Sequence, residues 1–248
     1  KHNGNWNPEP LAFERFARTM AAKDKVLPQF TATLPQNLAK SKAQVAVLLV
    51  TGELSLTSSE VDALKAFIAK GGLLYIDASG GSRITAKAAE DIAEKVGGDL
   101  PDYLSPDEKF YMLQGKEITR VRLRKSSKSV EPGLLMGVHK DKKLTVIVSP
   151  DDMVGGLLGI SSGAIKGYRP EYAYELFRNI LLFGHYGDPA KAAAKRAAAG
   201  KKAAAERRAA AAKKLAALRK AAEGAQKAAD AAKKAADALK KAEAELKA

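Results

Sequence analysis

The chain has 248 residues, of which 46% are hydrophobic and 28% are charged, a composition typical of a globular protein of one or two domains. It contains no cysteine, which excludes disulfides, thiolate metal sites and a cysteine nucleophile. No apolar run approaches the length of about eighteen residues that a membrane-spanning helix needs. No basic segment leads into an apolar one after Lys1, so we expect a signal peptide to be absent or already removed.

The net charge of +14 is unevenly distributed along the chain. Residues 188–248 contain 17 basic and 7 acidic residues, a net charge of +10, whereas residues 1–187 contain 25 basic and 21 acidic residues, a net charge of +4. The composition changes at the same point, because 29 of the last 61 residues are alanine. We therefore predict an α/β domain over residues 1–187 and an Ala/Lys-rich helical tail over residues 188–248.

The first half of the domain alternates helices and strands. Helices are indicated by apolar residues at helical spacing and by the capping box that starts at Thr57, and strands by short apolar runs. The predicted elements are a helix over residues 9–23, a strand over 43–50, a helix over 57–70, a strand over 73–76 and a helix over 84–96. This order is typical of βαβ units and of a mainly parallel sheet with helices on both faces.

The second half of the domain has a different pattern. Residues 118–124 alternate apolar or polar side chains with three arginines, and residues 140–143 form a predicted tight turn between two apolar runs, 134–138 and 144–148. A last core-facing helix over residues 173–181 is predicted to close at Gly184 and Gly187. The fold class is therefore α/β, a flavodoxin-like or amidotransferase-like three-layer sandwich with a partly antiparallel edge, followed by a long C-terminal helix.

Asp188-Pro189 is a typical helix start, and the alanine content of the tail favours a long helix from this point. Basic pairs recur every six residues, so their charge winds around the helix. After Lys220 the pattern changes to a narrow heptad-like seam of mostly alanine, which predicts at most weak helix pairing with a partner, a solitary solvated helix or frayed tail being the alternative. The basic pairs are Lys195-Arg196, Lys201-Lys202, Arg207-Arg208, Lys213-Lys214 and Arg219-Lys220.

Polar residues follow each predicted strand of the parallel sheet. Ligands of open parallel α/β sheets bind beyond the carboxyl ends of the strands, where loops and helix N-termini meet. The loop before the first helix is expected to join this rim, in the place to which an earlier strand of the fold would deliver it, so we expect that strand to be missing from this chain. The candidate rim residues are Asn5, Trp6, Glu9, Gly52, Glu53, Asp77, Ser79, Ser149, Asp151 and Asp152.

The sequence allows two roles for Asp77, Asp151 and Asp152. Carboxylates at strand ends are oxygen ligands for a divalent cation, or an acid and a base for hydrolysis; alternatively, they cap the helices and turns that follow. Ser79 would need a neighbouring base to act as a nucleophile, and the chain offers only three histidines; a turn-forming serine is the plainer interpretation. Trp6 is either a stacking platform for a sugar or base or a half-buried cover of its loop.

Four blocks of the domain resemble a bacterial family known as domain of unknown function 4159. They are Gly4-Asn5-Trp6 with Pro8-Glu9, Gly71-Gly72-Leu73-Leu74 running to Asp77, Gly137 to Asp152, and Asn179 in the last helix. The resemblance implies the topology of class I glutamine amidotransferases, in an N-terminally truncated form. In that fold a nucleophilic cysteine would follow a central strand, where this chain has Asp77-Ala78-Ser79, so glutaminase chemistry is excluded.

Three functions remain open from the sequence. The first is a non-catalytic α/β module that binds a ligand or a protein partner at the rim, with the tail as a basic spacer. The second is a hydrolase that uses the three aspartates, with a divalent metal as the only cofactor considered. The third is binding of a polyanion by the tail, together with a stripe formed by Arg120, Arg122 and Arg124, for which a charged, solvated edge strand is the alternative. The resemblance favours an extracytoplasmic bacterial setting.

Overall fold

The computed structural model describes residues 1–187 except 114, 126 and 127, together with residues 205, 206, 209, 210, 212, 213, 232–236 and 238. Contacts divide the chain into two units, Lys1–Ala193 and Ala194–Ala248. The described helices of the first unit are α1 (Ala12–Asp24), α2 (Pro35–Leu38), α3 (Ser58–Ala69), α4 (Arg83–Gly97), α5 (Val154–Leu158) and α6 (Pro170–Tyr186). Its described strands are β1 (Val45–Val50), β2 (Leu73–Ala78), β3 (Asp102–Tyr103), β4 (Met136–Lys140) and β5 (Lys143–Ser149).

The five strands form one mixed sheet in the order β1-β2-β5-β4-β3. The three strands β1, β2 and β5 are parallel and form one half of the sheet, with β1 at its edge, whereas β4 and β3 are antiparallel to their neighbours. Leu49 in β1 is aligned with Asp77 in β2, and Asp77 is aligned with Ser149 in β5, so the three strands end at the same level. The predicted α/β fold with a partly antiparallel edge is therefore confirmed.

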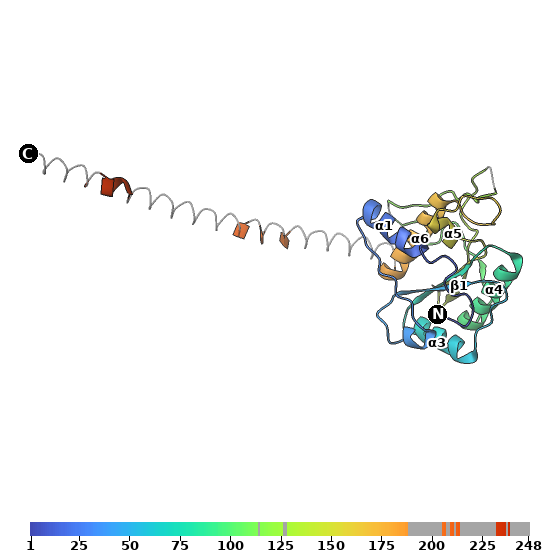
Figure 1. The fold of residues 1–248 in the computed structure, drawn as a ribbon. Coiled ribbons are helices and arrows are strands. Elements are labelled where there is room, and N and C mark those ends of the chain that lie inside the picture. Colours follow the sequence, from blue (N-terminus) through green and yellow to red (C-terminus); the bar gives the residue numbers. More distant parts are fainter. Residues whose placement is uncertain are drawn as a thin grey trace, which may run out of the picture. The chain divides into compact units, whose positions relative to one another are not determined.

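Two hydrophobic cores lie on opposite faces of the sheet, and the alternation of side chains along β2 explains both. Leu73 and Tyr75 belong to the core shared with α1, α5 and α6, and Leu74 and Ile76 belong to the core shared with α3 and α4. Figure 1 shows α1, α5 and α6 on one side of β1 and α3 and α4 on the other. Because both faces of β2 are covered, every residue of this strand is buried.

Local sequence signals position these elements as predicted. The Thr57 hydroxyl accepts a hydrogen bond from the Glu60 backbone N–H at 3.3 Å, and the Glu60 carboxylate accepts one from the Thr57 N–H at 2.9 Å, which completes the capping box at the start of α3. The turn between β4 and β5 consists of Asp141 and Lys142, whose φ angles of 50° and 62° are both left-handed. Two such residues make the type I′ turn that fits the twist of a hairpin.

Two predictions about elements were wrong. Residues 118–124 do not form a strand of the sheet: they make isolated bridges only, from Val121 to Val130 and from Leu123 to Tyr168. Their pairing partners are loops on the α6 side of the sheet, so the alternation does not mark an edge strand. Gly184 does not end the last helix but lies inside α6. A glycine is needed here because α6 packs closely on β1, and a Cβ at this position would lie 2.2 Å from Cγ2 of Val45.

The described residues of the tail, from Ala205 to Ala238 with gaps, are all α-helical and exposed. The predicted helix start at Asp188-Pro189 lies outside the described residues. Among the ten basic residues of the recurring pairs, only Lys213 is described, so the predicted winding of charge also lies outside them. Within the part of the chain that the structure describes, no helix is both long and apolar enough to cross a bilayer.

Candidate functional site

The carboxyl ends of β2 and β5 define the candidate site. Helix α4 follows β2 and packs on one face of the sheet, whereas α5 follows β5 and packs on the other face. Neighbouring parallel strands whose helices leave to opposite faces form a topological switch point, the usual ligand position in open α/β sheets. The predicted rim residues Asp77, Ser79, Ser149, Asp151 and Asp152 come together at this switch point, and all five are buried.

Asp77 lies inside β2 rather than after it. Its carboxylate is buried, and hydrogen bonds from three groups satisfy it there. The Tyr75 hydroxyl donates to Oδ1 at 2.8 Å, the Ser79 hydroxyl donates to Oδ2 at 2.9 Å, and the Met153 backbone N–H donates to Oδ1 at 3.0 Å. These donors favour the charged form. Burial and the negative charge of Asp152 outweigh them and raise the pKa of Asp77 to about 7.

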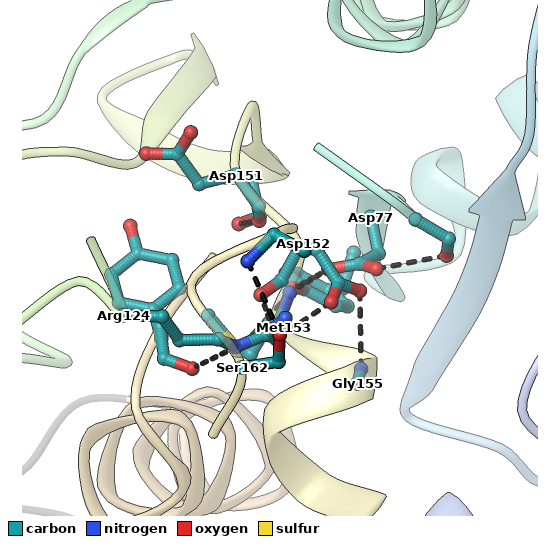
Figure 2. Close-up of polar contacts among 12 residues, drawn as sticks. Asp77, Arg124, Asp151, Asp152, Met153, Gly155 and Ser162 are labelled. Atoms are coloured by element: carbon teal, nitrogen blue, oxygen red, sulfur yellow. Dashed lines mark hydrogen bonds and ion pairs between the residues drawn. The ribbon is translucent and has the colours of Figure 1, made fainter. Parts of the chain in front are cut away.

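Asp152 forms a buried ion pair with Arg124. One Nη of Arg124 donates to Oδ2 of Asp152 at 2.6 Å, and the other carboxylate oxygen accepts the Gly155 backbone N–H at 3.1 Å. The same guanidinium donates to the backbone carbonyls of Asp152 and Tyr168 at 3.1 and 2.9 Å. Figure 2 shows Asp152 between Arg124 and Asp77. The pair thus joins residue 124, the turn after β5 and the segment before α6.

Asp151 faces a different partner from its two neighbours. Its Oδ1 lies 2.7 Å from Nζ of Lys166, which is an ion pair outside hydrogen-bond geometry, and this oxygen has no other hydrogen-bond partner. Figure 2 shows the Asp151 carboxylate turned away from Asp77 and Asp152. Gly81, after β2, lies directly against the same segment, because a Cβ there would be 1.8 Å from the Lys166 carbonyl oxygen. Residues 166–168 therefore close the switch point over the aspartates.

Ser79 is not arranged as a nucleophile. Its hydroxyl donates to Asp77, and its backbone N–H donates to the Val50 carbonyl at 3.0 Å, so it works as part of the turn after β2. The three histidines make other contacts: His2 with the Leu49 carbonyl at 2.8 Å, His139 with Glu108 at 2.8 Å, and His185 with Gln44 at 3.2 Å. None of these histidine contacts is with the Ser79 hydroxyl, so the histidine base of a serine triad is missing here.

The predicted rim residues at the end of β1 are separate from the aspartates. The Asn5 carbonyl accepts a hydrogen bond from the Thr51 hydroxyl at 3.4 Å, which attaches the first loop to the end of β1 as expected. Trp6 is half-buried and lies under the Lys1 ammonium, 4.9 Å from the ring centroid. Glu9 is half-buried, and Gly52 and Glu53 are exposed. This end of the rim is a polar surface, and the buried His2 ring next to it contacts the Leu49 carbonyl and the Gly4 backbone N–H.

The predicted stripe of three arginines does not exist as one surface. Arg120 is exposed and Arg122 is half-buried, but Arg124 is 5% exposed and held by Asp152. Because the segment pairs with loops rather than with a sheet edge, its side chains do not alternate between two faces. The prediction that Arg124 contacts a polyanion is therefore wrong, and its charge neutralises an aspartate inside the domain.

The carboxylates of the switch point are not gathered around a common point. Asp77 and Asp152 have donors on both of their oxygens, and Asp151 is turned toward Lys166. Among the described residues, no group of three histidine or acidic side chains is placed to hold a metal ion. The arrangement is that of side chains that tie loops together, which is the capping alternative considered from the sequence.

Sequence reasoning missed the residues that complete this network. Tyr75 was read only as part of an apolar run, although its spacing of two from Asp77 places both on one face of a strand. Arg124 was assigned to the surface, and Tyr168 was not considered. Burial and the neighbouring tyrosine and aspartate groups raise the pKa of Tyr168 well above its ordinary value, so it is a neutral hydroxyl. Only the fold brings residues 124, 152 and 168 together.

The surface above this network has a shallow depression of about 400 Å³. Gly81 and the first turn of α4 form one wall, and Pro150 and Lys166 form another. Arg83 and Lys166 contribute positive charge, and the exposed ring of Tyr103 contributes an apolar side. This depression is the described surface of the switch point that another molecule can reach.

Neither a scan against protein-family models nor a search of curated proteins found a match for this chain. The resemblance to the domain of unknown function family therefore stays a prediction.

Replacing Arg124 with methionine tests the buried ion pair. The change leaves the Asp152 charge buried without its partner, so we expect the free energy of unfolding to fall by about 3 to 5 kcal/mol. Urea denaturation followed by circular dichroism measures the change. Arg120→Met, at the exposed end of the same segment, should change it by no more than about 0.5 kcal/mol. Adding Asp152→Asn to Arg124→Met should recover part of the loss, and equal effects of Arg120→Met and Arg124→Met would contradict the assignment.

The raised pKa of Asp77 predicts a specific dependence of stability on pH. The unfolded carboxyl group loses its proton near pH 4, whereas the folded one keeps it until about pH 7. Between these values the unfolded state binds fewer protons, so the contribution of Asp77 to stability falls as the pH rises, by at most about 1.4 kcal/mol per pH unit. Urea denaturation between pH 5 and pH 8 should show this slope in the wild type and not in Asp77→Asn. Parallel pH profiles of the two proteins would contradict a protonated Asp77.

Proposed function

We propose that residues 1–187 form a non-catalytic module that binds a ligand or a partner at the carboxyl edge of the sheet, with the tail as a basic helical spacer. The support comes from what the residues at the switch point already do. Asp77 and Asp152 have donors on both oxygens, and Ser79 donates to Asp77. The chain contains no cysteine. Side chains engaged in this way stabilise the fold, and the histidine contacts among the described residues are made with groups other than Ser79.

The observation that carries the proposal is the depression above the switch point. Its position is the one at which open α/β sheets bind their ligands, since loops and a helix N-terminus meet there. Three cationic residues line it, Arg83 and Lys87 from α4 and Lys166 from the segment before α6, together with the acidic Glu90. Lys166 remains 56% exposed despite its contact with Asp151. We infer that the ligand, or the part of a partner that enters, carries an anionic group.

We also propose that the domain belongs to the family known as domain of unknown function 4159, on the strength of the blocks around Trp6, Asp77, Asp151 and Asn179. Asn179 is buried in α6, and its amide donates to the carbonyls of Phe110 and Lys116 at 2.9 and 2.8 Å. In this interpretation, Asp77-Ala78-Ser79 occupies the place of the nucleophile turn of an amidotransferase and keeps its shape without its chemistry. A metal-assisted hydrolase is less well supported, because the three aspartates do not converge.

A crystallographic screen with small carboxylates and phosphates tests the binding proposal. We expect anionic fragments to occupy the depression, with oxygens near Arg83 and Lys166. The affinity of each hit, measured by isothermal titration calorimetry, should fall by about tenfold in Arg83→Gln, because loss of a charged hydrogen bond typically costs about 1.5 kcal/mol or more. Lys65→Gln, an exposed lysine in the middle of α3, provides the matched loss of charge and should leave the affinity unchanged. Fragments that gather elsewhere on the domain would contradict the proposal.

We propose polyanion binding by the tail as a second, separate function. The support is the charge of residues 188–248, +10 over 61 residues, most of it in basic pairs with alanine between them. Lysine and arginine on an alanine-rich helix contact phosphates or sulfates without recognising a sequence. Binding releases the counterions that had condensed on the polyanion, which favours the complex. The same positive charge attracts the tail to negatively charged molecules and surfaces.

Glutamine substitution of the ten basic residues in the recurring pairs tests the tail in the full-length chain. Binding to heparin and to a mixed-sequence DNA duplex should weaken by at least about a hundredfold at low salt, because up to ten ionic contacts are lost. Fluorescence anisotropy at several salt concentrations measures both the affinity and the salt slope. Unchanged binding of the substituted chain would contradict a role for the tail, and a circular dichroism spectrum controls for its helix content.

A further inference from the structure

The amino edge of the sheet, opposite the switch point, carries a concentration of lysines. We define this edge by three segments: residues 38–44 before β1, residues 70–72 before β2, and the hairpin turn 140–143 between β4 and β5. They contain six exposed lysines and one acidic residue, Asp141, a net charge of +5. The whole domain has a net charge of only +4, so the remainder of its surface is close to neutral. The lysines are Lys40, Lys42, Lys70, Lys140, Lys142 and Lys143.

The strand register brings the three segments side by side. Val45 in β1 is paired with Leu73 in β2, and Leu74 is paired with Val146 in β5, so the three strands begin at nearly the same level. Lys140 and Lys143 face each other at the end of the hairpin. Four adjacent strands span roughly 15 Å at about 4.8 Å per strand. The lysine-bearing segments therefore lie along one edge of the sheet, over a length comparable to a few phosphates of one nucleic-acid strand.

Two contacts fix the middle of this row. The Lys70 ammonium donates to the Ala39 carbonyl at 2.7 Å, and the Lys143 ammonium donates to the Gly71 carbonyl at 3.3 Å. Each ammonium has further donors for an anion, because a lysine carries three N–H groups. A shallow depression of about 410 Å³ lies among Lys40, Lys42 and Lys70, with Phe67 at its base. An anionic group can enter this depression between three positive charges.

We infer that the amino edge is a docking surface for the phosphate backbone of double-stranded nucleic acid. The three segments contain none of the domain's large exposed hydrophobic side chains, so they offer no apolar anchor for a membrane surface. They also contain no aromatic ring on which unpaired bases can stack, which favours a duplex over a single strand. Lysines act as point charges, so the contact reads the backbone and not the sequence.

This surface is distinct from both the rim and the tail. Helix α6 also ends at the amino edge, because Gly184 packs against Val45 and His185 contacts Gln44. Gly187, the last described residue of the domain, follows that helix end.

The test compares two triple variants of the full-length chain that lose the same charge. The edge variant carries Lys42→Gln, Lys140→Gln and Lys142→Gln, and the control variant carries Lys65→Gln, Arg120→Gln and Lys125→Gln at exposed positions elsewhere on the domain. Fluorescence anisotropy with a 20-base-pair mixed-sequence duplex measures binding between 50 and 200 mM salt. We expect the edge variant to bind roughly tenfold more weakly at 100 mM salt, with a salt slope reduced by up to about 2.7, and the control to stay within about twofold of wild type.

Three results would overturn the inference. One is an equal loss of duplex affinity in the edge and control variants, which would indicate that binding depends on net charge and not on the amino edge. Another is an edge variant that binds the duplex as wild type does but no longer binds phosphatidylserine vesicles or polyglutamate. That result would indicate that the partner of the edge is a membrane or an acidic protein. A third is binding by the tail alone, seen as complete loss on tail neutralisation with no effect of the edge variant. Binding that survives tail neutralisation but not the edge variant would support the edge and contradict only the tail proposal.

Discussion

The buried ion pair between Arg124 and Asp152 lies where three segments outside the strands of the sheet meet. Arg124 donates to the Asp152 carboxylate and to the carbonyls of Asp152 and Tyr168, and the same carboxylate accepts the Gly155 N–H. A buried charge is costly unless it is paired, and both members of this pair are buried. Backbone bridges from Leu123 to Tyr168 and from Asp152 to Gly167 join the same segments, so the ion pair adds to backbone hydrogen bonds around the switch point. Asp152 also acts on Asp77, because burial and the negative charge of Asp152 raise the pKa of Asp77.

The fold was largely predictable because its signals are local. The apolar runs of β1 and β2, the capping box at Thr57 and the turn at Asp141-Lys142 each determine structure over a few residues, and the structure has them where the sequence places them. The wrong predictions concern long-range partners. Whether residues 118–124 pair with a sheet edge or with loops depends on residues 130 and 168, which no local pattern identifies. Gly184 was read as a helix stop, because the contact with Val45 that requires a glycine is made across the fold.

The candidate site was predictable in position but not in chemistry. The rule that ligands bind beyond the carboxyl ends of parallel strands correctly placed Asp77, Ser79 and Asp151 near one another. The sequence could not show that these side chains face inward, since burial is a property of the whole chain. Hydrogen bonds from Tyr75 and Met153 convert a potential acid or metal ligand into a structural group. The surface available for binding is consequently formed by neighbours such as Arg83 and Lys166, which carry no recognisable motif.

The packing of α6 on β1 also determines how the domain would respond to mechanical load. A force applied along the chain from residue 188 enters the domain at the end of α6, whose residue Gly184 is in contact with Val45 at the start of the central sheet. Because α6 carries much of one core, such a force acts first on the packing of this helix against the sheet, including its contact with the edge strand β1.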